Sequence, residues 1–279
     1  MPMALVNGVR LFYDLAGDGP PLVLVHGSWG GAAGWEPVLP LLTQRFRVLV
    51  YDRRGHSGSE RPSSQGSTAE DVADLAALMA HLEFGPAHVV GVSSGASLAL
   101  RLAAQHPTLI RSVAAHEPAL FALFADDAED GTVMREALER FAAVAAIVAA
   151  GDAERGARQF AETVAYGPGA WELIPPERQQ VMIGNAPTWV DEMRDPGSWT
   201  ADPAALTAIA CPVLLTRGDQ SLPFWPPVVA KVAALLPHAQ TQVIAGAGHV
   251  PQASQPEAYA ATVTAFISAA DEDEGRPEA

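Results

Sequence analysis

The chain has 279 residues, of which 49% are hydrophobic, so it is long enough to bury a large core. Its net charge of −15 argues against nucleic acid and anionic membranes as partners, and no run of about 18 apolar residues predicts a membrane span. The first ten residues lack the basic and apolar regions of a signal peptide, and a single cysteine excludes an internal disulfide, so we predict a cytoplasmic protein.

Short apolar strands alternate with helices along most of the chain. An Asn7-Gly8 turn precedes the first strand, and the helix predicted over 68–82 has apolar residues at helical spacing. The predicted strands cover 9–14, 22–26, 46–51, 87–92, 110–115, 212–216 and 240–245, and further helices cover 96–105 and 256–269. Strands that are apolar throughout indicate an α/β fold, with a mostly parallel sheet covered by helices on both faces.

One long region carries helices and no strand. Helical runs are predicted within 121–206, at 133–150, 152–165, 176–183 and 189–194. An all-helical insertion between two strands is typical of a lid over the strand ends. We therefore predict a core domain formed by 1–120 and 207–269, a helical lid at 121–206, and an acidic, disordered tail at 270–279.

The most informative motif is Gly91-Val92-Ser93-Ser94-Gly95. A G-x-S-x-G box between an apolar strand and a helix holds its serine on a sharp turn, with the hydroxyl above the sheet edge. The N-terminus of the following helix supplies free N–H groups that suit an oxyanion. This context favours a nucleophilic Ser93 over a strand-to-helix turn without chemistry.

A serine nucleophile needs a base, and His249 is the best candidate. It lies in the glycine-rich loop 246–251, directly after the last predicted strand. The histidines at 81, 88, 106 and 238 have no partner pattern, so we expect them at the surface or in packing. No metal-ligand spacing and no nucleotide-binding glycine motif occurs in the sequence, so we expect neither a metal nor a cofactor.

The order of the motifs resembles the α/β-hydrolase superfamily. His26-Gly27-Ser28-Trp29 follows a strand, and the segment 52–59, the Ser93 elbow and the His249 loop follow in the family's order. The chain resembles the members with a serine nucleophile, since epoxide hydrolases and haloalkane dehalogenases carry aspartate at the elbow. The resemblance implies that the backbone N–H groups of Ser28 and Ser94 form the oxyanion hole, and that 52–59 is structural.

The acid of the triad has two candidates. Most relatives place it after the next-to-last strand, three residues beyond a glycine, but here that position is Ser221, and Asp219 lies only one residue after Gly218. Some branches, including the zearalenone lactonases, carry the acid after the strand that follows the elbow helix. Glu117 occupies that place, 24 residues after Ser93 (117 − 93), so we favour it over Asp219.

These residues predict hydrolysis of a carboxylic ester or lactone. We expect an uncharged, medium-sized apolar substrate in a pocket formed by Gly27, Trp29, Phe121, Trp189 and Val250, whereas most other lid aromatics pack the lid itself. The alternatives are a carbon–carbon bond (diketone) hydrolase, a cofactor-free perhydrolase and a non-catalytic ligand receptor on the same fold. The oligomeric state is not predictable from this sequence.

Overall fold

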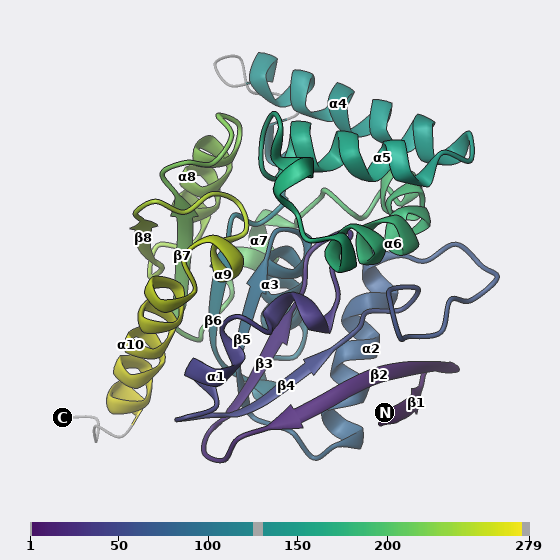
Figure 1. Ribbon diagram of the computed structural model, residues 1–279. Helices are drawn as coiled ribbons and strands as arrows, with labels where there is room; N and C mark the ends of the chain where they lie inside the picture. Colours follow the sequence, from purple (N-terminus) through teal and green to yellow (C-terminus); the bar gives the residue numbers. More distant parts are fainter. Residues whose placement is uncertain (1, 125–130, 275–279) are drawn as a thin grey trace.

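A single eight-stranded sheet forms the centre of the protein in the computed structural model, which describes residues 2–124 and 131–274 (Figure 1). Its strands are β1 (Met3–Val6), β2 (Val9–Ala16), β3 (Pro21–Val25), β4 (Arg47–Tyr51), β5 (Ala87–Val92), β6 (Ile110–His116), β7 (Val213–Gly218) and β8 (Gln240–Ile244). They lie in the order β1-β2-β4-β3-β5-β6-β7-β8. β2 pairs antiparallel with β1 and β4, and the remaining pairs are parallel, which confirms the predicted sheet.

Helices cover both faces of this sheet and one of its ends. The α-helices of the described residues are α1 (Leu39–Leu42), α2 (Thr68–His81), α3 (Ser94–Gln105), α4 (Gly131–Ala149), α5 (Ala153–Phe160), α6 (Pro176–Arg194), α7 (Pro203–Thr207), α8 (Trp225–Leu235), α9 (Pro251–Ser254) and α10 (Pro256–Glu274). Short helical turns are η1 (Ala32–Trp35), η2 (Pro107–Leu109), η3 (Phe121–Phe124), η4 (Ala161–Ala165) and η5 (Ala170–Leu173). Within the described part of the chain, no helix is long and apolar enough to cross a membrane.

The strands divide the core into two layers because neighbouring side chains of a strand point to opposite faces. In β3, Val23 and Val25 pack with residues of α2, α3 and α8 on one face. Leu22 and Leu24 pack with residues of α1 and α10 on the other. Both faces are apolar, which explains why the central strands read as continuous hydrophobic runs in the sequence.

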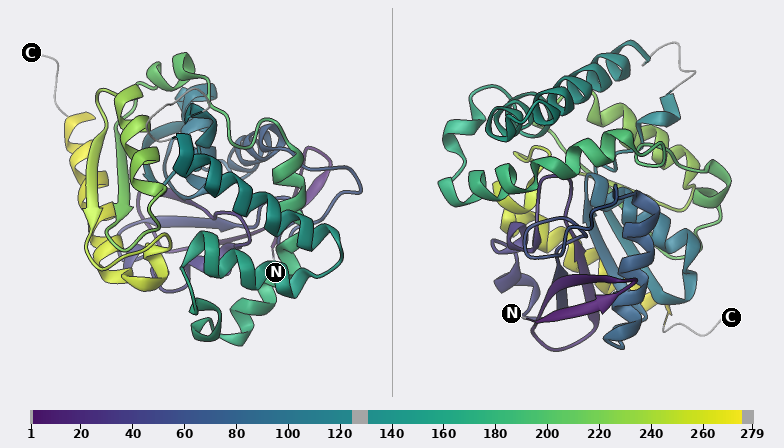
Figure 2. Two further views of the ribbon diagram at one scale, coloured as in Figure 1. Left: turned by 90° about the horizontal axis from the view of Figure 1, so that it is seen from above. Right: turned by 90° about the vertical axis from the view of Figure 1, so that its right-hand side faces the viewer.

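The helices α4, α5 and α6 lie together over one end of the sheet (Figures 1 and 2). This end is the carboxyl edge of the parallel strands, where Ser93 follows β5 and Glu117 follows β6. The edge is therefore covered by the insertion that the sequence predicts as a lid. Asn185 of α6 fastens the lid to the core, since its side-chain amide donates to the Gly30 carbonyl over 2.6 Å and its oxygen accepts from the Ser57 N–H over 2.7 Å.

The structure corrects two sequence predictions in the helical parts. The runs predicted at 176–183 and 189–194 form the single helix α6, which passes through Pro187. Pro187 is exposed, on the solvent side of the helix, and the helix continues past it although its ring nitrogen donates no hydrogen bond. The helix α8 was not predicted from the sequence.

The tail predicted as disordered at 270–279 is partly helical, because α10 continues to Glu274. Ala270 is buried, and Asp271 forms an ion pair with Arg111 of β6 at 2.7 Å, which holds this last turn against the sheet. The disorder prediction for 270–274 is therefore wrong. Residues 275–279 lie outside the described residues.

Candidate active site

Ser93 sits on a strained turn between β5 and α3. Its backbone angles are φ 56° and ψ −125°, a conformation that costs free energy for any residue with a Cβ atom. The turn is held by a hydrogen bond from the Ser93 N–H to the His116 carbonyl at 2.9 Å. A Cβ atom on Gly91 would lie 2.3 Å from the Gly95 oxygen, so the backbone approaches itself too closely for a side chain there. These features are those of a nucleophile elbow.

The close approach at Gly95 gives a first testable prediction. A Cβ atom there would lie 2.3 Å from the Val25 carbonyl oxygen, a backbone atom that cannot move aside. Gly95→Ala is expected to lower the free energy of unfolding by about 3 kcal/mol or more. Gly184→Ala is the matched control: nothing lies within 4 Å of its Cβ position in α6, so it is expected to raise stability by about 0.5–1 kcal/mol.

Urea unfolding of both variants measures this difference. Equal stability of Gly95→Ala and the wild-type protein would contradict the packing described for the elbow.

His249 is paired with Glu117 at the same edge of the sheet. Its Nδ1 atom lies 2.7 Å from Glu117 Oε2, and both side chains are buried. The other carboxylate oxygen of Glu117 accepts a hydrogen bond from the Gly218 N–H at 3.0 Å. Two partners therefore fix the carboxylate, and the carboxylate orients the imidazole.

The electrostatic surroundings keep Glu117 ionised. Burial raises the pKa of this carboxyl, but interactions led by the hydrogen bond from His249 outweigh it, so the net shift is downward. Burial also lowers the pKa of His116 to about 4, despite the opposing effect of Glu117. His116 Nδ1 bonds the Thr216 hydroxyl at 2.9 Å, and its Nε2 lies 3.8 Å from Glu117 Oε2. A neutral His116 thus packs beside the Glu117 carboxylate.

Asp219, the other candidate acid, lies elsewhere. Its side chain is exposed and accepts a hydrogen bond from the Gly246 N–H at 2.8 Å. This contact ties the loop after β7 to the loop that carries His249. Among the described residues, the carboxylate that meets His249 is that of Glu117 and not that of Asp219.

Trp225 is a site residue that sequence reasoning missed. Its indole stacks on the His249 imidazole with ring centroids 3.9 Å apart and an angle of 14° between the planes. The ring fixes the imidazole from one side, and its electron-rich face favours a positive charge on the histidine. Its only sequence signal is its place as an aromatic residue directly after the loop that follows β7.

A cavity of about 200 Å³, including its open mouth, lies beside Ser93. Core, lid and α8 all contribute to its wall: Ser28, Ser93, Ala119, Phe121, Phe141, Phe160, Val164, Trp189, Trp199 and Trp225. No side chain among these carries a charge. The cavity is therefore an aromatic, apolar compartment with two hydroxyl groups at its base.

The predicted pocket residues separate into two groups. Phe121 and Trp189 line the cavity. Gly27, Trp29 and Val250 are not among the described residues that line it. Trp29 lies behind the wall, because its ring stacks on Phe160 at 4.8 Å and the ring of Phe160 covers it. A Cβ atom on Gly27 would lie 3.0 Å from Ser93 Cβ, so its backbone passes directly beside the nucleophile.

Ser28 and Ser94 flank Ser93 from two segments. Ser28 follows Gly27 in the loop after β3, and Ser94 is the first residue of α3. The first N–H groups of a helix have no partner inside the helix, so the Ser94 N–H is available to a ligand. The two hydroxyl oxygens lie 3.0 Å apart, which brings these residues together beside the cavity.

His26 holds the loop of Ser28 in its neutral form. Its Nε2 accepts a hydrogen bond from the Arg53 N–H at 3.0 Å, so the proton is on Nδ1, which lies 2.8 Å from the Gly27 carbonyl oxygen. Burial, with the nearby Arg53 cation, lowers the pKa of His26 to about 3. Protonation would remove the acceptor for Arg53.

This shift predicts how stability depends on pH. Between pH 6.5 and about 3, the unfolded chain binds a proton on His26 that the folded chain does not. The stability that neutral His26 contributes is therefore complete above pH 6.5. As the pH falls below this value, His26 lowers the free energy of unfolding by up to about 1.4 kcal/mol per pH unit. His26→Gln keeps an acceptor for Arg53 but cannot titrate, so its slope is expected to be smaller by about one proton.

Urea unfolding of both proteins at pH 7, 6 and 5 measures the two slopes. Parallel curves would refute the assignment of a neutral, buried His26.

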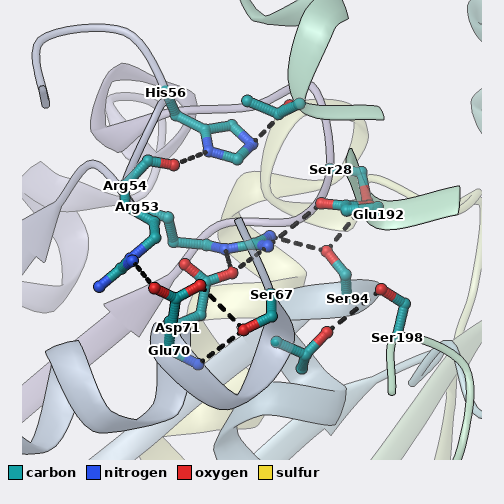
Figure 3. Close-up of polar contacts among 12 residues, drawn as sticks. Ser28, Arg53, Arg54, His56, Ser67, Glu70, Asp71, Ser94, Glu192 and Ser198 are labelled. Carbon is teal, nitrogen blue, oxygen red and sulfur yellow. Dashed lines mark hydrogen bonds and ion pairs between the residues drawn. The ribbon is translucent and has the colours of Figure 1, made fainter. Parts of the chain in front are cut away.

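A buried group of charges lies beside Ser28 and Ser94 (Figure 3). Arg53 forms ion pairs with Asp71 of α2 at 2.6 Å and with Glu192 of the lid helix α6 at 3.1 Å. Arg54 turns the other way, to Asp74 at 2.7 Å and to Glu70. The sequence indicated a structural role for 52–59, but it carried no signal that a lid carboxylate reaches Arg53.

Comparisons with known proteins agree with this geometry. The model of the alpha/beta hydrolase family matches residues 22–262. A 2-(acetamidomethylene)succinate hydrolase from Mesorhizobium japonicum is 30% identical over 270 residues, covering 91% of this chain and 90% of the relative.

Two solved structures show the same fold. An enol-lactonase from Burkholderia xenovorans has a TM-score of 0.80 at 22% identity, covering 96% of this chain and all of that one (100%). A meta-cleavage product hydrolase from Pseudomonas fluorescens has a TM-score of 0.73 at 19% identity, covering 97% and 98% of the two chains. The family match, the elbow and the sheet order lead to one conclusion: the chain belongs to the alpha/beta hydrolase family.

Proposed function

We propose that the protein is a serine esterase or lactonase that cleaves its substrate through an acyl-enzyme. The observation that carries this proposal is the buried hydrogen bond of 2.7 Å between His249 Nδ1 and Glu117 Oε2, at the sheet edge where Ser93 forms the elbow. A carboxylate on Nδ1 leaves Nε2 of the imidazole as the proton acceptor, which is the tautomer that a general base requires.

In the proposed acylation, Ser93 Oγ attacks the ester carbonyl carbon while His249 takes the hydroxyl proton. The tetrahedral oxyanion that forms is stabilised by the backbone N–H groups of Ser28 and Ser94. When it collapses, the bond to the alcohol breaks and His249 returns the proton to the leaving oxygen. Glu117 stays ionised and stabilises the imidazolium in between, in keeping with its lowered pKa.

Deacylation repeats these steps with water as the nucleophile. His249 takes a proton from water, the resulting hydroxide attacks the acyl carbon, and Ser93 leaves with that proton. The products are a carboxylic acid and an alcohol, or one hydroxy acid from a lactone. Trp225 stacks on the imidazole and favours the charged state that occurs twice in this cycle.

The cavity supports an uncharged, apolar acyl group as the substrate class. Six aromatic rings line it, at positions 121, 141, 160, 189, 199 and 225. The Mesorhizobium relative is named for a succinate derivative, but an apolar wall without charged side chains does not suit a dicarboxylate.

A substrate panel tests the proposal. p-Nitrophenyl esters of acetate, butyrate, phenylacetate and succinate, a macrolactone and a vinylogous diketone are compared by kcat/KM. We expect the apolar esters or the lactone to lead and the succinate monoester to be weakest. Turnover of the diketone alone would replace the proposal with carbon–carbon bond hydrolysis, and tight binding without turnover would favour a receptor.

A further inference from the structure

Four side chains around the nucleophile close into a hydrogen-bonded ring (Figure 3). Arg53 Nη1 lies 2.9 Å from Ser94 Oγ, and Ser94 Oγ lies 3.0 Å from Ser28 Oγ. Ser28 Oγ lies 2.5 Å from Glu192 Oε2, and Glu192 Oε1 lies 3.1 Å from Arg53 Nη2. The ring therefore begins and ends on one guanidinium group.

The chemistry of the groups fixes the direction of the hydrogen bonds. A guanidinium only donates and an ionised carboxylate only accepts. Ser28 has one proton, which goes to Glu192, so the contact between the two hydroxyls carries the proton of Ser94. Each hydroxyl then donates once and accepts once. Donation runs from the guanidinium to the carboxylate along two paths, one directly to Glu192 and the other through Ser94 and Ser28. Such chains polarise each other and resist rotation of a single hydroxyl.

The charges of the ring are buried and held from outside it. The exposed fractions are 3% for Arg53 and 8% for Glu192. Asp71 accepts from Nε and Nη2 of Arg53 at 3.1 and 2.6 Å, which fixes the plane of the guanidinium and points Nη1 at Ser94. Buried ion pairs contribute little net stability compared with apolar side chains of similar size. We therefore interpret the buried ion pair of Arg53 and Glu192 as a means of orienting the hydroxyl groups of Ser94 and Ser28.

The ring joins segments that lie far apart in the chain. Ser28 belongs to the loop after β3, Arg53 to the loop after β4, and Ser94 to the first turn of α3. Glu192 comes from the lid helix α6 and is 164 residues from Ser28. Only with α6 seated on the core is the ring closed.

We propose that Arg53 and Glu192 are positioning residues that hold Ser28 and Ser94 through their hydroxyl groups, so that the two oxyanion-hole N–H groups take their working positions only when the lid helix is docked. This inference rests on the proposed function, in which those N–H groups bind the oxyanion. In this proposal the side chains of Ser28 and Ser94 fix the position of their own backbone N–H groups. The lid helix α6, besides covering the cavity, supplies the carboxylate that holds these side chains.

A pair of neighbouring lid substitutions tests the proposal. Glu192→Gln keeps the shape of the side chain but removes the charge that accepts from both Ser28 and Arg53. We expect kcat to fall about 10–100-fold with little change in KM, because misplaced donors lose transition-state binding and not substrate binding. Asp191→Asn, one residue earlier, loses only a partly exposed pair with Arg61 and is expected to stay within about twofold of the wild-type kcat.

A second test removes a hydroxyl group of the ring. Ser94→Ala keeps its backbone N–H and is expected to lower kcat by a similar factor. The affinity of a trifluoromethyl ketone, whose adduct places an oxyanion in the hole, should fall by the same factor. Adding Glu192→Gln to Ser94→Ala should cost little more, because both break one ring. Ser112→Ala, which removes a buried hydroxyl bonded to His88, is the control and should keep wild-type kcat.

Hydrogen exchange of the amides in 26–31 and 93–96 provides a readout that does not depend on activity. We expect faster exchange in both segments in Glu192→Gln and not in Asp191→Asn. Wild-type kcat and wild-type exchange in Glu192→Gln and Ser94→Ala would overturn the ring proposal. A wild-type protein without any hydrolytic activity would instead refute the proposed function, and the exchange comparison would still decide whether the ring positions these segments.

Discussion

Ser93→Ala is expected to lower kcat for the best ester of the panel by about 10⁴–10⁶-fold, because no acyl-enzyme forms without the hydroxyl. The substitution removes one oxygen atom and leaves the backbone of the elbow unchanged, so the fold should persist. KM should change little, since the cavity wall and the oxyanion donors remain. Stopped-flow kinetics with a p-nitrophenyl ester measures both quantities and, in the wild-type protein, the burst of p-nitrophenol that precedes steady turnover.

Covalent labelling provides the control for this prediction. A phosphonate ester should add one adduct mass to the wild-type protein and none to Ser93→Ala, and circular dichroism should give the same spectrum for both. A variant that keeps wild-type turnover would show that another group is the nucleophile and would contradict the proposed mechanism.

Glu117→Gln is expected to lower kcat by about 10³–10⁴-fold. The amide oxygen can still accept from the Gly218 N–H, but the amide nitrogen then faces His249 Nδ1 and favours the tautomer with its proton on Nε2. That imidazole cannot take a proton from Ser93. It also loses the carboxylate that stabilises the imidazolium.

Asp219→Asn is the matched control for this prediction. Asp219 is exposed, and its Oδ1 accepts from the Gly246 N–H at 2.8 Å, a contact that asparagine can keep. We expect its kcat to stay close to that of the wild-type protein. Since Glu117 is fully buried, thermal unfolding of both variants separates lost chemistry from lost folding. A large loss in Asp219→Asn with full activity in Glu117→Gln would move the acid to the more common position.

Features with a local sequence signature could be predicted. The elbow is one of them, because a Cβ atom on Gly91 or Gly95 would lie only 2.3 Å from a backbone oxygen, so both positions require glycine. The central strands are another, since burial on both faces demands continuous apolar runs. The carboxyl ends of parallel strands meet at one edge, so the order of strands also indicates that Ser93, Glu117 and the loop of His249 lie near each other.

Features that depend on contacts between segments far apart in the chain could not be predicted from the sequence. The ion pair of Arg53 with Glu192 spans 139 residues, and neither residue carries a periodic or spacing signal for it. The stacking of Trp225 on His249 likewise joins the start of α8 to the loop after β8, and no motif connects the two. Trp29 was expected in the cavity wall, but the lid's Phe160 covers it, which only the docking of α5 decides.

The strand-turn-helix pattern, the hydrophobic runs and the glycines were sufficient to identify the fold, the nucleophile elbow and the loop of the base, because each depends on backbone geometry within a few residues. The partner of His249 and the ring around Arg53 depend on side-chain distances near 3 Å between remote segments, and the aromatic wall depends on how side chains of such segments pack. Sequence spacing places such groups at a common edge of the sheet. It does not show that Glu117 lies 2.7 Å from His249 while Asp219 bonds the Gly246 N–H instead. Packing of the lid and of β6, β7 and β8 against each other makes that choice.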